Sequence, residues 1–312
     1  MATSKENKVY NFMGLRYAAL GMSGLLIVLS IWSLAVNRLN FGLDFTGGTL
    51  IEVGYEQPAD LNGIRDVMVS AGFEDAVVVQ FGSEQDVLIR MQRGFTDTLG
   101  EEVLTLLRDN ISADDSIELR RVEFVGPQVG DELRDQGGLA MLAALGIIMI
   151  YIALRFQFKF SVGAVAALAH DVIITLGFFS FFQVNFDLTV LAALLAVIGY
   201  SLNDTIVVAD RIRENFRTMR KSSPTEVINT ALTDTLSRTL VTSLTTVMVL
   251  LALFFYGGEI IHSFAEALLL GVGIGTYSSI YIAASILLTM DVTHEDLIVE
   301  VVKEGEFMDD LP

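Results

Sequence analysis

The sequence predicts a polytopic α-helical membrane protein with six transmembrane helices in a one-plus-five arrangement and an external α+β domain inserted after the first helix. Hydrophobic residues make up 52% of the 312 residues and charged residues 19%, which is more apolar than an ordinary soluble domain. The apolar residues gather in six windows of about the 20 residues that a bilayer core requires. The windows cover residues 15–36, 137–155, 160–182, 187–209, 239–257 and 262–289.

These windows divide the chain into five parts. We expect a cytoplasmic N-terminus (1–14), a first helix (15–36), an external domain (37–136), a five-helix domain (137–290) and an acidic cytoplasmic tail (291–312). The first window is longer than the apolar core of a signal peptide, so it is predicted to remain as an anchor. Lysines and arginines flank the ends that would face the cytoplasm, such as Arg155 and Lys159 after the second helix. Both termini are therefore expected in the cytoplasm, with the large domain on the far side.

The insert after the first helix has the pattern of a small α+β domain. Apolar and polar residues alternate in "GTLIEVGY", "AVVVQF", "DVLIRMQ" and "SIELRRVEFV", and a helical pattern follows the first and the third of these segments. The order β-α-β-β-α-β is that of a ferredoxin-like domain. No histidine occurs before residue 170, and the carboxylates fall at solvent-facing positions. We therefore expect this domain to bind or to move, not to catalyse a reaction.

The stretch "NFGLDFTGGTL" joins the first helix to this insert. A phosphate-binding loop would need a Lys-Ser/Thr pair after its last glycine, and none is present. Gly42, Gly47 and Gly48 permit a sharp turn out of the helix, while Phe41 and Phe45 suit the membrane interface. The pattern favours a hinge over a ligand loop.

Composition excludes several classes of site. The chain has no cysteine, which excludes disulfides, thiolate metal sites and a cysteine nucleophile. Its net charge of −18 and pI of about 4.4 argue against nucleic-acid binding, which needs concentrated basic residues. The three histidines are scattered at 170, 262 and 294. No metal site is predicted.

Three charged residues fall inside or at the ends of the apolar windows, where a charge costs about 2.5–3.5 kcal/mol on insertion scales. They are Asp171, Asp204 and Arg238. Asp204 lies about 24 Å along its helix from the outer end, and Arg238 lies about 27 Å from the outer end of the next, antiparallel helix, at 1.5 Å per residue. The matching depth predicts an ion pair between Asp204 and Arg238.

Two interpretations of this pair remain open. It is either a permanent ion pair that fixes helix register or a proton site, in which protonation of Asp204 weakens its hold on Arg238 and permits a second packing of the helices. Each proton would deliver about 2.3 kcal/mol per 100 mV of membrane potential. Polar neighbours of Asp204 in the sequence, Tyr200, Ser201, Asn203 and Thr205, would hold relay water.

Asp171 is a weaker candidate for the proton pathway. His170 beside it points about 100° away on a helix, so the pattern predicts that His170 is not its direct partner. Packing or an interhelix hydrogen bond is the alternative role for this aspartate.

Small residues recur every four positions in the sixth window: Ala267, Gly271, Gly275, Ser279 and Ala283. Such a stripe lets helix backbones approach closely. It either slides or packs statically. Gly273, off the stripe, adds local flexibility.

The segment "SSPTEVINTALTDTL" predicts a helix start in the loop before the fifth window. Ser223 is the expected N-cap, Pro224 the first helical residue and Glu226 the third, which together form a capping box. Four apolar residues are then expected along the inner membrane interface: Val227, Ile228, Ala231 and Leu232.

Four motifs together resemble one known family. "FGLDFTGG", "AHDVIITLGFF", "IGYSLNDTIVVADRIREN" and "TLSRTLVTSLTT" are similar, in this order and over about residues 15–290, to the SecF branch of the SecDF family within the resistance-nodulation-division superfamily. The resemblance implies a bacterial inner-membrane protein that uses proton-motive force to promote preprotein translocation. Protons would be the coupling ion, with no other cofactor.

The resemblance also implies partners and site residues. The expected partners are SecD, the SecYEG channel, YajC, a translocating unfolded polypeptide and membrane lipids. Asp204 and Arg238 would belong to the proton pathway, and "GLDFTGG" would mark the junction of the first helix with the exported domain, capped by Asp44.

Two other function classes were weighed. An intramembrane aspartyl protease would use Asp171 and Asp204 as a pair, but an arginine beside Asp204 would keep it ionised instead of sharing a proton, so the chain is not expected to be an enzyme. The alternative is a half-unit of a proton-driven exporter of small molecules or lipids of the resistance-nodulation-division type. Such exporters combine two of these units, and this chain has one external insert, so a partner chain is expected.

Overall fold

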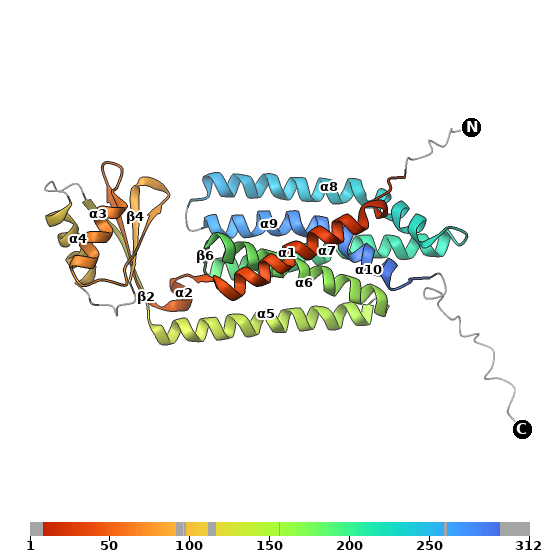
Figure 1. The fold of residues 1–312 in the computed structure, drawn as a ribbon, viewed down its shortest axis with the longest axis horizontal. Helices are drawn as coiled ribbons and strands as arrows, with labels where there is room; N and C mark the ends of the chain where they lie inside the picture. The colour runs from red at the N-terminus through yellow and green to blue at the C-terminus, as the bar shows by residue number, and fades with distance from the viewer. Residues whose placement is uncertain are drawn as a thin grey trace, which may run out of the picture.

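The computed structural model describes residues 9–91, 96, 98–111, 117–155, 157–258 and 261–293. A bundle of long helices carries a small α+β domain at one end (Figure 1). Residues 1–8 and the acidic tail from residue 294, including His294, lie outside the described residues.

Six helices are long and apolar enough to cross a membrane, which confirms the predicted one-plus-five arrangement. The first is η1 (Met13–Leu15) with α1 (Arg16–Val36), and the next four are α5 (Pro127–Arg155), α6 (Phe158–Phe182), α7 (Leu188–Thr218) and α8 (Pro224–Tyr256). The sixth is α9 (His262–Ser278), which continues through the π-helical segment η3 (Ser279–Ala283) into α10 (Ala284–Thr289). Several helices extend past the apolar windows, because their polar ends are helical as well; α5, for example, begins at Pro127 instead of residue 137.

The spans differ greatly in how much of their surface the protein itself covers. In α6, α7 and α9, between 50% and 61% of the membrane window is buried, whereas the share is 6% in α5 and 11% in α8. Figure 1 shows α5 and α8 on opposite sides of the bundle, with α1 crossing it diagonally. The apolar surfaces of α5 and α8 therefore face lipid or another chain.

The α+β domain contains β2 (Gly48–Tyr55), α3 (Leu61–Ser70), β3 (Val77–Phe81), β4 (Ser83–Met91), α4 (Leu99–Asn110) and β5 (Ile117–Val125), in the element order expected from the sequence. Its four strands pair antiparallel in the order β3-β4-β2-β5. Alternate residues of the strands, such as Ile51 and Val53, face the two helices and are fully buried. Burial raises the pKa of Tyr55, at the end of β2, to about 12.

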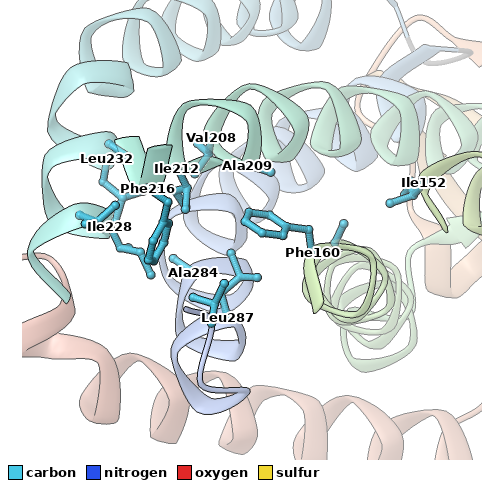
Figure 2. Close-up of a cluster of buried hydrophobic side chains, with 14 of the residues drawn as sticks. Ile152, Phe160, Val208, Ala209, Ile212, Phe216, Ile228, Leu232, Ala284 and Leu287 are labelled. Carbon is cyan, nitrogen blue, oxygen red and sulfur yellow. The ribbon is translucent and has the colours of Figure 1, made fainter. Parts of the chain in front are cut away.

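A second core lies at the end of the bundle away from the α+β domain (Figure 2). Helix α8 begins there with the predicted capping box: the Glu226 amide donates to Ser223 Oγ at 3.3 Å, and the Ser223 amide donates to Glu226 Oε2 at 3.0 Å. The apolar residues expected along the inner membrane interface are buried in this core, with Phe216 and Leu287; they are Val227, Ile228, Ala231 and Leu232. They belong to the first turns of the continuous helix α8, so they pack inside the bundle instead of facing its surroundings.

Candidate functional site

Asp204 is the charged residue around which three membrane helices meet. It lies on α7 with 7% of its surface exposed. Thr239 Oγ1 on α8 donates to Asp204 Oδ1 at 2.8 Å, and Ser279 Oγ, the first residue of η3, donates to Asp204 Oδ2 at 2.5 Å. Each carboxylate oxygen thus has one hydroxyl donor, from a different helix.

Arg238 does not face Asp204. Its side chain is exposed, and in the part of the chain that the structure describes no ion pair joins it to Asp204, so the predicted pair is wrong for this structure. The depth was predicted well, because the neighbouring residue Thr239 reaches Asp204. Consecutive residues of a helix point about 100° apart, and residue counting does not determine how α8 is rotated about its axis.

Arg238 instead lines a cavity of about 510 Å³ between α5, α7 and α8, on the side of Asp204 away from the α+β domain. The cavity wall is made of both charged and apolar side chains: Tyr151, Arg155, Ile206, Val207, Asp210, Arg211, Glu214, Asp234, Thr235 and Arg238. Arg211 joins two of these acids, with contacts of 2.8 Å to Asp234 and 2.7 Å to Glu214. Polar walls and this volume make the cavity accessible to water to within one helical turn of Asp204 along α7.

Asp171 on α6 holds a second buried network. Its Oδ2 accepts from Ser201 Oγ on α7 at 2.5 Å and from Ser278 Oγ on α9 at 2.8 Å. These contacts confirm the interhelix hydrogen-bond role considered for this aspartate. Its Oδ1 lies 2.8 Å from His170 Nδ1, which corrects the expectation that His170 is not its direct partner. Backbone directions at adjacent helix positions diverge, but a carboxylate and the near nitrogen of an imidazole both lie close enough to the backbone to turn toward each other.

The two networks meet at one turn of the sixth span. Ser278 donates to Asp171 and the next residue, Ser279, donates to Asp204. Sequence reasoning missed Ser278 and Thr239, although each is adjacent to a residue it singled out. Both reach their acid only through packing between helices, with the partners 107 and 35 residues apart in the sequence, so no local pattern in the sequence identifies them.

The polar neighbours of Asp204 in the sequence serve different partners. Tyr200 donates to Ser243 at 3.0 Å, and Ser201 donates to Asp171. Asn203, a predicted member of the proton pathway, is exposed and makes none of the contacts that Asp204 makes. The Thr205 hydroxyl is buried and has no hydrogen-bond partner among the described residues.

The small-residue stripe packs against α7. A Cβ atom at Gly271 would collide with the side chain of Val197, and one at Gly275 would lie 3.0 Å from Ser201 Cβ. A Cβ at Gly273 would meet nothing within 4 Å. The close approach expected of the stripe is therefore present, and it brings Ser279 to Asp204.

Several contacts hold the junction after α1 against the helix bundle. Strand β1 (Asn40–Phe41) pairs in parallel with β6 (Asn185–Phe186), and the short helix α2 (Leu43–Thr46) follows Gly42. Asp44 Oδ2 accepts from the Leu188 amide at 3.0 Å. Asp44 thus caps the start of α7 instead of the junction itself.

The glycines of the junction make the turn into β2. Gly47 and Gly48 have φ values of 66° and 120°, which glycine adopts readily. Phe45 is buried with Phe186 instead of lying at a membrane interface, because the strand pair covers it. The geometry fits the predicted sharp turn. Residues 40–46, which we call the strap, are nevertheless held in place by the pairing of β1 with β6 and by the contact of Asp44 with Leu188.

Arg90 connects the α+β domain to the strap by a hydrogen bond. From β4, its Nη1 donates to the Phe41 carbonyl at 2.8 Å. Partial burial lowers the pKa of Arg90 from its ordinary value.

Comparisons with known proteins identify relatives that share the helix bundle and the junction after α1. Residues 102–293 match the family model described as protein export membrane protein SecD/SecF, C-terminal, and residues 32–59 match that of the SecD/SecF GG motif. The chain is 51% identical to protein translocase subunit SecF of Vibrio alginolyticus, covering 99% of this chain and 98% of the relative. It is 53% identical to the SecF subunit of Pseudomonas aeruginosa, covering 97% of both chains.

Two solved structures of SecDF are similar as well. The crystal structure of SecDF from Thermus thermophilus, a translocon-associated membrane protein, superposes with a TM-score of 0.82 at 35% identity. A structure of SecDF in a super-membrane-facing form gives a TM-score of 0.68 at the same identity. Each comparison covers 91% of this chain and 39% of the SecDF chain, so this chain spans well under half of the solved protein.

Proposed function

Because the chain belongs to the SecD/SecF family of protein-export membrane proteins, we propose that it acts with a SecD-type partner and uses proton-motive force to promote preprotein translocation across the bacterial inner membrane. Both termini then lie in the cytoplasm and the α+β domain in the periplasm. Protons are the coupling ion; the proposal requires no other cofactor, no metal and no enzymatic reaction.

The observation that carries this proposal is the buried carboxylate of Asp204, which has hydroxyl donors on two other helices. An ionised carboxylate in the hydrocarbon region is costly unless a cation balances it. Among the described residues no cation contacts Asp204 in this structure. Uptake of a proton therefore removes a charge that the bundle does not balance.

Protonation also changes what the carboxyl group offers to α9. An ionised carboxylate only accepts hydrogen bonds, whereas the protonated form donates one as well. Ser279, which donates to Asp204, begins the π-helical segment η3, and π-helical turns inside α-helices occur frequently at functional sites. A changed bond at Ser279 shifts α9 along the small-residue stripe, and this movement reaches the α+β domain through the strap.

Arg238 completes the cycle in a second packing of the bundle. Thr239 and Arg238 are neighbours on α8, so a rotation of α8 exchanges the hydroxyl that faces Asp204 for a guanidinium. The cavity lined by Arg238 gives the long side chain room and lies on the side of Asp204 away from the α+β domain, which is the cytoplasmic side in the proposed topology. The two solved forms of SecDF support a family that changes conformation.

The partner is expected on the exposed helices. The membrane windows of α5 and α8 bury only 6% and 11% of their residues within this chain. The solved SecDF chain is more than twice as long as the part matched here, which leaves room for a SecD half. We assign α5 and α8 to this interface, with lipids over the remaining surface. The proposal includes SecYEG, YajC and an unfolded polypeptide as further partners, in line with the resemblance to this family.

The test is translocation into membrane vesicles that contain the chain, its SecD-type partner and the Sec channel. Asp204→Asn keeps the volume but cannot bind a proton; its one amide oxygen accepts from one of the two hydroxyls, and its NH2 group donates to the other. We expect the stimulation by proton-motive force to be lost while ATP-driven translocation and membrane insertion persist. Asp66→Asn is the matched control, because Asp66 is an exposed acid on α3, outside the cavity and the contacts of Asp204. Equal stimulation in Asp204→Asn and wild type would contradict the proposal.

A further inference from the structure

The buried pair His170 and Asp171 is not used by the mechanism above. His170 is 3% exposed and Asp171 is 1% exposed, and both lie in the middle of α6. A histidine at such a position is costly unless every polar atom is satisfied. The contacts of the pair determine how many protons it holds.

Counting hydrogen-bond donors around His170 gives a definite answer. Its Nε2 lies 3.1 Å from Ser23 Oγ, and Ser23 Oγ donates to the Tyr277 hydroxyl at 3.2 Å. The Tyr277 hydroxyl donates to the Ala19 carbonyl at 2.8 Å. A carbonyl only accepts, so this bond uses the single proton of Tyr277. The contact between Ser23 and Tyr277 then uses the single proton of Ser23.

With that proton committed, Ser23 can only accept from His170, so Nε2 carries a hydrogen. On the other side of the ring, Nδ1 faces Asp171 Oδ1 at 2.8 Å. The second oxygen of Asp171 receives the hydroxyl of Ser201 at 2.5 Å and that of Ser278 at 2.8 Å, which is closer to Ser278 than its other acceptor, the Gly275 carbonyl at 3.1 Å. A carboxylate that receives hydroxyl protons and an Nδ1–H is fully satisfied in its ionised form. The network as a whole therefore fits an imidazolium paired with a carboxylate.

We propose that His170 and Asp171 form a second proton-binding site, coupled to Asp204 through the turn that contains Ser278 and Ser279. Release of its proton leaves a neutral imidazole whose Nε2 accepts, and Ser23 then turns its own proton from Tyr277 to His170. The proton leaves from Nε2, and the net charge of the pair changes from zero to minus one. The coupling rests on the proposed function, whereas the existence of the site does not.

The surroundings offer a route for coupling and few competing charges. Helix α1 contributes Ser23 and the Ala19 carbonyl, α7 contributes Ser201, and α9 contributes Ser278 and Tyr277, which stacks on His170 with ring centroids 6.2 Å apart. Tyr277 is thus the titratable group that faces the pair from α9.

Along α7, the Tyr200 hydroxyl donates to Ser243, and the acid nearest to Ser201 is Asp204, three residues further along the helix. Ser278 and Ser279 are consecutive, so a change at one carboxylate moves the donor of the other.

The experiment is nitrogen NMR of the full chain, labelled with ¹⁵N-histidine, in lipid bilayers. The chain has three histidines, so His262→Gln and His294→Gln together leave only the signal of His170. At neutral pH we expect both ring nitrogens to carry hydrogen. Tyr277→Phe frees the proton of Ser23 for Nε2, so the doubly protonated signal should fall at the same pH; Tyr17→Phe, on the exposed surface of α1, should leave it unchanged.

Coupling is measured in the same samples. In Asp204→Asn, the pH at which half of the doubly protonated signal is lost should differ measurably from that of the wild type, because coupled sites change each other's occupancy. A neutral ring throughout the range from about pH 5 to 8, where histidine ordinarily changes its charge, would overturn the proposal. So would a titration of His170 that Asp204→Asn does not shift.

Translocation assays separate this proposal from the proposed function. His170→Gln should remove the gradient-stimulated part of translocation and retain the ATP-driven part, while His262→Gln should behave as wild type. If Asp204→Asn translocates normally and His170 still titrates, the proposed function fails and the second proton site stands. If Asp204→Asn is defective and His170→Gln is not, the site plays no part in the cycle and the inference is overturned.

Discussion

Replacing Gly271 by alanine tests whether the contact between α7 and α9 is as close as the structure shows. An added Cβ would collide with both methyl groups of Val197, which is fully buried and has no free space to enter. The helices must therefore separate, or Val197 must adopt a poor rotamer. Overpacking of this kind costs about 1–3 kcal/mol.

The cost is partly offset, because alanine is a better helix former than glycine by about 0.5–1 kcal/mol. Gly271→Ala should therefore lower the free energy of unfolding by about 1–2 kcal/mol. Gly273→Ala is the matched control, since it lies two residues away on the same helix and an added Cβ meets nothing within 4 Å. It should raise the free energy of unfolding by about 0.5–1 kcal/mol.

The assay is reversible unfolding of the full chain in mixed micelles, followed by helix content as denaturing detergent increases. Because α7 and α9 must approach for Ser279 to reach Asp204, Gly271→Ala should also reduce translocation stimulated by proton-motive force. Equal stability of the two variants would refute the close packing. A destabilised Gly271→Ala variant with normal gradient-stimulated translocation would refute the link between the stripe and Asp204.

Three further predictions concern the ends of helices and the α+β domain. Asp44→Ala removes the acceptor of the Leu188 amide, so thermal unfolding in detergent should show a loss of about 1 kcal/mol, which Asp44→Asn largely restores. Ser223→Ala breaks the capping box with Glu226 and should cost about 1 kcal/mol in the same assay; no loss would mean that tertiary packing alone holds this helix start. The pKa of Tyr55 is raised to about 12, so its contribution to stability is complete below its unfolded pKa of about 10 and is lost as pH rises through about 12. In an ultraviolet titration of tyrosine ionisation, Tyr55→Phe should remove the step near pH 12. Ionisation of Tyr55 near pH 10 would contradict its burial.

The six spans could be predicted because their signal is local. Each is a run of apolar residues whose length follows from bilayer thickness, and alternation within the insert gave the strands in the same way. The extra length of α8 could not be read from hydropathy, since its first turns, from Pro224, are polar on one face. Burial of Phe45 depended on the pairing of β1 with β6, which joins segments about 145 residues apart and leaves no local pattern.

In the candidate site, the buried acids and their depth could be predicted from the sequence, but the rotation of the helices could not. Charges in apolar windows identified Asp171 and Asp204, because such residues are rare enough to stand out. Depth along a helix follows from residue counting, and it placed the α8 partner of Asp204 correctly to within one residue. Rotation about the helix axis depends on packing against neighbours, so Thr239, not Arg238, faces the carboxylate in this structure.

The measurement that bears most directly on the central claim is infrared difference spectroscopy of the chain with its partner in vesicles, with and without a proton gradient. The account predicts a carbonyl band of a protonated carboxylic acid that appears or disappears with the gradient, is absent from Asp204→Asn and persists in Asp66→Asn. A carboxyl group at Asp204 that stays in one protonation state at every gradient would contradict it.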